Sequence, residues 1–202
     1  MRAAIASAPP RARGRHGLLA GLALLIGGNA SGAARDDEQA EFAFAHNAYR
    51  YTYATALDAD VEAVTAIVTD FDRLHRLNDG ITVSRVLERY DEHHVKRLLD
   101  GRQCVLMFCF KLRLVEDVRV TPGHVRARVI AGEGSFSAGD MDWYYTAAGA
   151  GRTRITFSAA QTLDIWIPPV IGPLVLKRVF LREVRETCAN IERLARSTAR
   201  PP

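Results

Sequence analysis

The sequence predicts an α+β domain in which a curved antiparallel sheet of seven strands grips one long C-terminal helix. Two observations lead to this fold class. Between residues 81 and 163, apolar residues alternate along segments separated by turn signals, which is typical of an antiparallel meander. After Pro173, apolar residues recur instead at steps of three and four, which places them on one face of a helix. This apolar stripe consists of Leu176, Phe180, Val184, Cys188, Ile191 and Ala195.

Residues 1–33 have the pattern of a secretory signal peptide. Three arginines between residues 11 and 15 precede an apolar run at 18–28, and small residues follow up to an expected cut after Ala33. The apolar run is too short to span a bilayer comfortably. The alternatives are an uncleaved anchor and a disordered tail. We expect cleavage, and therefore a periplasmic or secreted protein.

The net charge of +4 comes from this leader, because residues 1–33 contain four arginines and no acidic residue. Without them the chain has 23 basic and 23 acidic residues, so the remainder is formally neutral. A nucleic-acid-binding domain usually carries a basic excess. The charge balance therefore gives no reason to expect a nucleic-acid partner.

The other elements are expected within a single domain at residues 45–198, after a loose segment at 34–44. Residues 49–57 alternate in polarity and are expected to form the first strand. Two short helices follow at 61–71 and 71–77, and an Asn-Asp-Gly turn ends the second helix. Six further strands are expected at 81–90, 93–110, 113–121, 124–131, 134–147 and 152–163.

The chain contains three cysteines, Cys104, Cys109 and Cys188. Cys104 and Cys109 differ by five positions, so in one regular strand they face opposite sides of the sheet. A bridge between them would need a bulge or a turn. We predict instead that all three are free thiols buried as small hydrophobic residues. No metal site is predicted, because the sequence has no CxxC motif and no paired histidine spacing.

Four stretches of the chain resemble the START-like superfamily, also known as polyketide cyclase or SRPBCC, and most closely its coenzyme Q-binding START-domain family. These stretches are residues 64–89, 104–110, 134–146 and 165–173. The resemblance implies a helix-grip fold with a cavity between the sheet and the terminal helix. The superfamily includes lipid carriers, hormone receptors and cyclases, so the resemblance implies no catalytic residue and no cofactor.

Within such a cavity, the lining is expected to be apolar and largely aromatic. The expected lining residues are Phe108, Phe110, Trp143, Tyr145, Phe157, Phe180 and Val184. Ordinary core packing is the alternative for each. The proline-rich loop before the terminal helix is expected to be the portal, with Trp166, Ile167, Val170 and Ile171 exposed at the cavity mouth or in transient contact with a membrane. The alternative is that Trp166 plugs the space under the helix.

Two carboxylates are weak candidates for acid–base chemistry. Glu116 alternates in phase with Leu112 and Leu114, so it can face the cavity, and Asp142 is adjacent to Trp143. A carboxyl group in an apolar pocket has a raised pKa and can serve as an acid or a base. Glu116 is the better candidate, although an exposed strand carboxylate is the commoner case.

The sequence therefore favours a carrier or binding protein for an apolar small molecule or lipid, such as a quinone-like or fatty-acyl compound. A cyclase- or dehydratase-like enzyme that uses a buried carboxylate is the first alternative. An interaction module with a filled core is the second.

Overall fold

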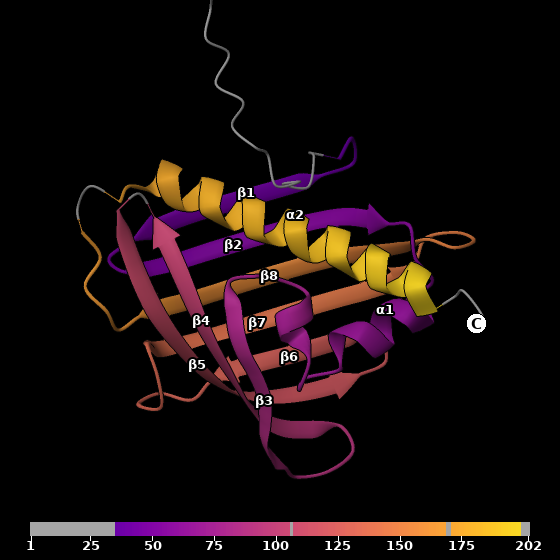
Figure 1. Cartoon of the computed structure of the whole chain (residues 1–202), viewed down its shortest axis with the longest axis horizontal. Coiled ribbons are helices and arrows are strands. Elements are labelled where there is room, and N and C mark those ends of the chain that lie inside the picture. The colour runs from indigo at the N-terminus through magenta and orange to yellow at the C-terminus, as the bar shows by residue number, and fades with distance from the viewer. Residues whose placement is uncertain (1–34, 106, 169–170, 199–202) are drawn as a thin grey trace, which may run out of the picture.

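The computed structural model describes residues 35–105, 107–168 and 171–198. The expected signal peptide lies outside these residues. The fold is α+β, with an eight-stranded antiparallel sheet, helices α1 and α2 and a short 3₁₀ helix (Figure 1). The helical elements are α1 (Val61–Val68), the 3₁₀ helix η1 (Leu74–Arg76) and α2 (Pro173–Thr198). The strands are β1 (Gln39–Ala45), β2 (Ala48–Leu57), β3 (Ile81–Arg89), β4 (His94–Val105), β5 (Phe108–Thr121), β6 (His124–Val129), β7 (Phe136–Ala147) and β8 (Thr153–Leu163).

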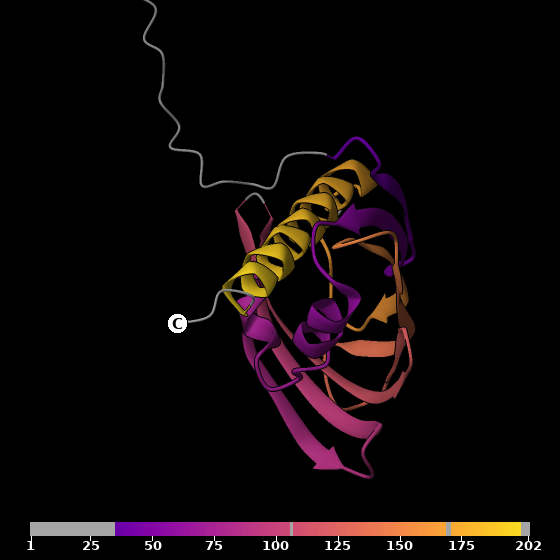
Figure 2. The ribbon, with the colours of Figure 1, turned by 90° about the vertical axis from the view of Figure 1, so that its right-hand side faces the viewer.

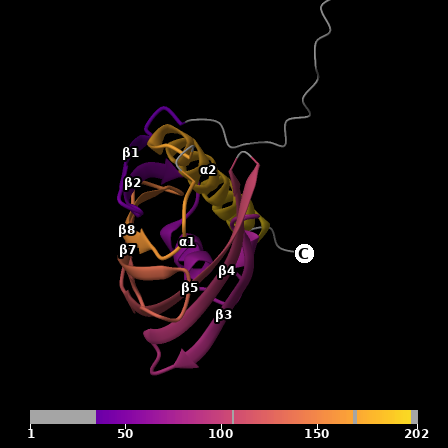
Figure 3. The same ribbon diagram turned by 90° about the vertical axis from the view of Figure 1, so that its left-hand side faces the viewer.

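The order of strands in the sheet is β1-β2-β8-β7-β6-β5-β4-β3. Every neighbouring pair is antiparallel, and β2 and β8 are the one pair of neighbours far apart in the sequence. The sheet curls strongly, and α2 lies across its concave side (Figures 2 and 3). The predicted helix-grip architecture is therefore confirmed, with eight strands in place of seven.

The additional strand is β1, which lies in and just beyond the segment expected to be loose. Its residues pair with β2 from Gln39 opposite Ala54 to Ala45 opposite Ala48. The two strands are joined by a tight turn in which His46 and Asn47 both have positive φ angles, of 51° and 61°. Such turns are usually marked by Asn-Gly or Asp-Gly. The His-Asn pair at this position is a weaker signal, and the hairpin was missed.

The expected strand at 93–110 is in fact two strands, because β4 ends at Val105 and β5 begins at Phe108. The turn places Cys104 directly opposite Cys109 in the β4–β5 register, and the two are joined in a disulfide. The prediction of three free thiols is therefore wrong for this pair. It rested on one continuous strand, in which the two side chains would have faced apart. Cys188 is free and buried, as predicted.

The terminal helix α2 begins at Pro173, as predicted, and its 26 residues give it a length of about 39 Å. Proline suits the first turn, where no partner for a backbone N–H is lost. Four residues of the predicted stripe, Val184, Cys188, Ile191 and Ala195, are buried, and the other two, Leu176 and Phe180, are partly buried. Glu192 is buried beside them.

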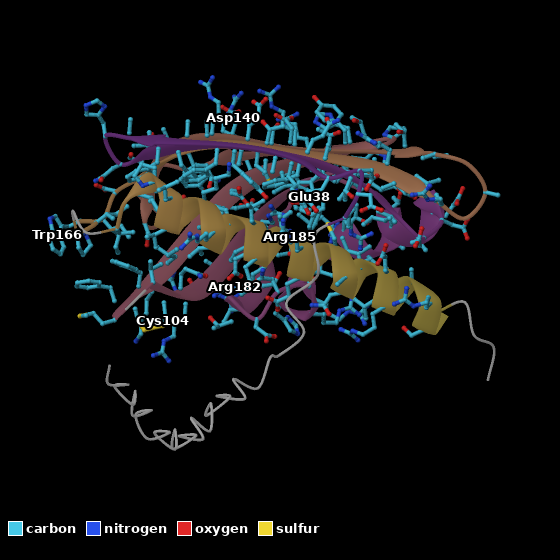
Figure 4. The ribbon with its side chains drawn as sticks, turned by 90° about the horizontal axis from the view of Figure 1, so that it is seen from above. Glu38, Cys104, Asp140, Trp166, Arg182 and Arg185 are labelled. Atoms are coloured by element: carbon cyan, nitrogen blue, oxygen red, sulfur yellow. A yellow bond between two sulfur atoms is a disulfide. The ribbon has the colours of Figure 1, made fainter. Side chains whose placement is uncertain are left out.

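Two ion pairs fasten the segment before β1 to α2. Arg35 donates two hydrogen bonds of 2.8 Å to the carboxylate of Glu192, which also accepts one from the backbone N–H of Asp58. Arg185 binds both carboxylate oxygens of Glu38, with Nη2–Oε1 at 2.7 Å and Nε–Oε2 at 2.9 Å (Figure 4). The segment from Arg35 to Glu38 is therefore an integral part of the folded domain.

The Glu38–Arg185 pair should make stability depend on pH. The guanidinium of Arg185 lowers the pKa of Glu38 below its ordinary value. Because the folded-state pKa is the lower one, this contribution is present above the unfolded pKa of about 4.3 and is lost as the pH falls through the folded value. We expect Glu38→Gln to be less stable than the wild type at neutral pH, with a gap that narrows below about pH 4.

The measurement is the free energy of unfolding by urea at neutral and at acid pH. Glu41→Gln is the matched control, because Glu41 is an exposed carboxylate on β1, and it should change stability little at either pH. If the stability difference between the wild type and Glu38→Gln is the same at both pH values, the charge of the carboxylate does not contribute to stability.

Candidate ligand-binding cavity

A cavity of about 250 Å³, the inner chamber, lies between the concave face of the sheet and α2. Its wall is mostly apolar, and consecutive strands each contribute to it because alternate residues of a strand point to the same face. Representative lining residues from β4, β5, β6, β7, β8 and α2, in that order, are Leu99, Leu114, Val125, Trp143, Phe157 and Phe180.

One ion pair, Arg97 with Glu116, interrupts this apolar wall. The two residues are directly opposite each other on β4 and β5 and are 4% and 1% exposed. The Nε and Nη2 atoms of Arg97 lie 2.9 and 2.8 Å from one oxygen, Oε2 of Glu116. The guanidinium carbon also lies 5.3 Å from the centroid of the Phe71 ring, at cation–π distance. The opposite charges are thereby neutralised within the wall of the chamber.

Each residue of this pair has a further hydrogen-bonding atom that lies outside the contact between them. Both contacts converge on Glu116 Oε2, so Glu116 Oε1 and Arg97 Nη1 take no part in them. A carboxylate oxygen accepts and a guanidinium nitrogen donates. The inner chamber can therefore offer both an acceptor and a donor to a polar group placed inside it.

A second polar pair in the wall is Tyr49 with Gln161. The Tyr49 hydroxyl donates a hydrogen bond to Gln161 Oε1, and both side chains are buried. Burial raises the pKa of the Tyr49 hydroxyl well above its ordinary value. The phenol therefore stays neutral and remains a donor, which fixes the position of the Tyr49 ring.

An outer chamber of about 200 Å³ lies between the end of the β4–β5 hairpin, the loop at 164–172 and the first turns of α2. Gln103 and Glu183 contribute polar side chains to its lining, and almost all of the remaining surface is apolar. Its apolar wall includes Val105, Phe110, Leu112, Ile165, Ile167, Ile171 and Leu176.

Three large apolar side chains are exposed on the segments that bound the outer chamber. Met107 at the tip of the β4–β5 hairpin is 85% exposed, Trp166 in the loop is 72% exposed, and Leu174 in the first turn of α2 is 75% exposed. Figure 4 shows Trp166 and Cys104 at the same end of the molecule. Apolar surface is thus concentrated where the outer chamber meets the solvent.

The family called "Polyketide cyclase / dehydrase and lipid transport" has a sequence profile that matches residues 49–196. The chain belongs to this family. The match extends from β2 almost to the end of α2, so it includes both chambers and the Arg97–Glu116 pair. A comparison with curated proteins found no significant match.

Solved structures with the same fold include members of the START superfamily. The Zhui aromatase/cyclase from Streptomyces sp. R1128 superposes with a TM-score of 0.62 at 12% identity, over 76% of this chain and 96% of that one. A START superfamily protein from Mycobacterium smegmatis gives a TM-score of 0.57 at 16% identity, over 74% and 98%. The lipid transfer domain of human StarD13 gives 0.58 at 12% identity, over 81% and 86%. At these identities the likeness concerns the fold. The resemblance to the START-like superfamily is confirmed, whereas the closer resemblance to its coenzyme Q-binding family stays a prediction.

In this member of the polyketide cyclase/dehydrase and lipid transport family, the residues expected to line a cavity occupy three kinds of position. Trp143 and Phe157 line the inner chamber, Phe110 lines the outer one, and Phe180 lines both. Tyr145 and Val184 are buried in the core and line neither chamber. Phe108 begins β5 beside the hairpin tip and lines neither.

Three of the four expected portal residues lie in the described part of the loop beside the outer chamber. Ile167 and Ile171 line it, while Trp166 is exposed and is therefore not packed under the helix as a plug. Val170 lies outside the described residues.

Of the two candidate carboxylates, Glu116 faces the inner chamber, where it is paired with Arg97. Asp142 instead bonds to His124 at 2.7 Å, and both side chains remain partly exposed to solvent. Arg97 was missed in the sequence, although its position two residues from both Val95 and Leu99 is a signal that it shares their inward face.

Within residues 35–105, 107–168 and 171–198, no cluster of His, Cys, Asp and Glu is arranged to hold a metal ion. None of the described helices has both the length and the apolar character needed to cross a bilayer.

The Arg97–Glu116 pair allows a direct test of the geometry. Removing one partner leaves an uncompensated buried charge, so we expect Arg97→Met to lower the free energy of unfolding by about 3–5 kcal/mol. The double variant Arg97→Met/Glu116→Leu removes both charges and should cost less than the sum of the two single changes. Urea unfolding of the four proteins in this double-mutant cycle provides the measurement.

The matched control is the pair of Arg113 with Asp100, which joins the same two strands but is largely exposed on the arginine side. Arg113→Met should cost less than about 1 kcal/mol. Equal effects at Arg97 and Arg113 would mean that the buried pair is not desolvated.

Proposed function

We propose that this protein is an exported binding protein or carrier for an apolar small molecule or lipid that bears one compact polar group. The observation that carries the proposal is an apolar two-chambered cavity with a single buried ion pair in its wall. Quinone-like and fatty-acyl compounds both have this combination of a polar end and an apolar body. The predicted resemblance of the sequence to the coenzyme Q-binding family favours a quinone among them.

In ligand pockets, apolar and polar groups commonly make different contributions to binding. Apolar walls provide most of the binding free energy, at about 0.8 kcal/mol for each methylene group buried, and a few polar groups fix the orientation. A ligand carbonyl or carboxylate can accept a hydrogen bond from Arg97 Nη1, and a ligand hydroxyl can donate one to Glu116 Oε1. The ion pair thus orients the ligand without placing a net charge in the cavity.

Relatives support the general class of ligand. The family description names both polyketide cyclases or dehydrases and lipid transport. The structural neighbours include an aromatase/cyclase and the lipid transfer domain of human StarD13. Both kinds of protein suggest an apolar or aromatic molecule within the fold, and neither identifies the ligand of this chain.

Two independent features support export. The sequence of residues 1–33 has the charged, apolar and small-residue regions of a signal peptide. The folded domain carries the Cys104–Cys109 disulfide at an exposed hairpin tip, and exposed disulfides persist mainly in oxidising compartments such as the periplasm. Periplasmic or secreted protein is therefore the proposed mature form.

An enzymatic role, as a cyclase or dehydratase, is the second candidate because Glu116 is a carboxylate in the wall of the inner chamber. The filled interaction module is disfavoured by the presence of the two chambers. Glu116→Gln distinguishes the first two roles. A carrier should release its bound compound chemically unchanged with either residue at this position, whereas an enzyme that uses the carboxylate should convert the compound and lose turnover in the variant.

The test of the proposed function starts from the full chain with its leader, recovered from the periplasm. We expect organic extraction and mass spectrometry to find an apolar compound bound in near-stoichiometric amount. We also expect the emptied protein to bind a fluorescent quinone or fatty acid. Recovery of unprocessed protein from the cytoplasm would contradict export, and absence of binding to every probe would contradict the carrier role.

The portal loop provides a further prediction. Trp166 is exposed and Ile167 borders the outer chamber, so replacing both by serine removes apolar surface at the mouth with little loss of core packing. We expect this double variant to exchange a fluorescent fatty acid with phospholipid vesicles several-fold more slowly, while the urea midpoint changes little.

Leu87→Ser is the matched control, because Leu87 is an exposed apolar residue on β3 and lines neither chamber. It should leave exchange unchanged. A large fall in the urea midpoint of the Trp166/Ile167 variant, with normal exchange kinetics, would show a structural role for the loop in place of a portal.

A further inference from the structure

The two chambers are separated by a partition of two aromatic rings. Tyr49 and Phe180 are the residues that the inner and outer linings share, among those the structure describes. Their ring centroids are 4.8 Å apart, which is contact distance for aromatic side chains. Anything that occupies both chambers must therefore pass this pair.

The two halves of the partition differ in how firmly they are held. Tyr49 is fixed by its hydrogen bond to Gln161, so moving it would leave a buried polar group without a partner. Phe180 has no polar side-chain atom, and it packs against the core with its ring centroid 5.2 Å from that of Phe42 and 5.4 Å from that of Tyr51. Rotation of the Phe180 side chain leaves no polar group unsatisfied, so Phe180 is the half that can move.

The volumes of the two chambers indicate that Phe180 must rotate before one ligand can occupy both of them. Ligand pockets usually measure roughly 300–1,000 Å³. The inner chamber, at about 250 Å³, and the outer chamber, at about 200 Å³, are each below that range. Together they offer about 450 Å³, which lies within it. A ligand of ordinary size fits only when the partition is open.

We infer that Phe180 is an internal gate whose position determines how long a chain the protein accepts. This inference rests on the proposed function and narrows its ligand class. The inner chamber contains the polar groups of Arg97, Glu116 and Gln161, whereas the outer chamber has a largely apolar wall beside the loop. The ligand is therefore an extended amphipathic molecule, with its polar end in the inner chamber and its tail past Phe180 in the outer one.

The test uses two substitutions that change the gate in opposite directions. Phe180→Ala removes the ring and joins the chambers, and Phe180→Trp enlarges it. The probes are saturated fatty acids from octanoate to stearate, each displacing anilinonaphthalene sulfonate from the full mature chain. Each additional methylene that leaves water strengthens binding about fourfold, so the dependence of affinity on chain length reports the space available.

In the wild type we expect affinity to rise over the short acids and then to flatten where the chain must displace Phe180. In Phe180→Ala, the ratio of palmitate affinity to octanoate affinity should increase about tenfold or more, since the extra methylenes find space without displacing a ring. In Phe180→Trp the same ratio should fall below that of the wild type. General destabilisation of the fold cannot produce these opposite shifts.

Leu181→Ala is the matched control, because Leu181 is a partly buried neighbour on α2 that lines neither chamber. It should leave the ratio unchanged. Phe180→Leu serves as the opening variant if Phe180→Ala does not fold, as judged by circular dichroism and the urea midpoint.

The outcomes separate the gate from the proposed function. Fatty-acid binding by the wild type, with the same palmitate-to-octanoate ratio in every Phe180 variant, would overturn the gate and leave the carrier role intact. Absence of binding at every chain length, in the wild type and the variants alike, would overturn both.

Discussion

The packing of α2 across the concave face of the sheet is the contact on which the rest of the structure depends. The two ends of the helix make different contacts. From Val184 onward the helix buries Val184, Cys188 and Ile191 in the core, and it is fastened to the N-terminal segment by the Glu38–Arg185 and Arg35–Glu192 pairs. The helix also packs against α1. The N-terminal half instead presents Leu176 and Phe180 to the chambers. One end of the helix thus supplies stability, while the other end borders the two chambers.

The buried Arg97–Glu116 pair is hard to explain as a source of stability. Desolvating two charges costs several kcal/mol for each ion, and well-packed apolar residues of similar volume often serve stability as well or better. The pair nevertheless lies in the wall of the inner chamber, and Arg97 Nη1 and Glu116 Oε1 take no part in the contact between the two residues. A polar group whose structural benefit is small and whose remaining hydrogen-bonding capacity faces a cavity is better explained by recognition of a ligand.

Periodicity in the sequence was sufficient to predict the helix, most of the strands and the inward orientation of Glu116. It failed where the signal was not local. The turn between β4 and β5 contains apolar residues and none of the Gly, Pro, Asn or Asp that normally mark a reversal, so Cys104 and Cys109 were assigned to one strand. Arg97 could be recognised as the partner of Glu116 only from the register of two strands, and this turn sets that register. The partition at Phe180 depends on packing between β1, β2 and α2, which no sequence pattern specifies.

The outer chamber is bounded by two segments that are held in different ways. The β4–β5 side is stiff, because a full antiparallel ladder runs to Val105 opposite Phe108 and the Cys104–Cys109 disulfide crosslinks its end. On the opposite side, the described part of the loop is held by hydrogen bonds from the Asn47 side chain to the Ile165 carbonyl and from the Asp164 N–H to the Ser135 carbonyl. Its residues are unequally buried, because Ile171 is 3% exposed whereas Trp166 is 72% exposed. The proposed route of the ligand therefore runs between the crosslinked hairpin and this loop, beside the exposed Trp166, and meets Phe180 next.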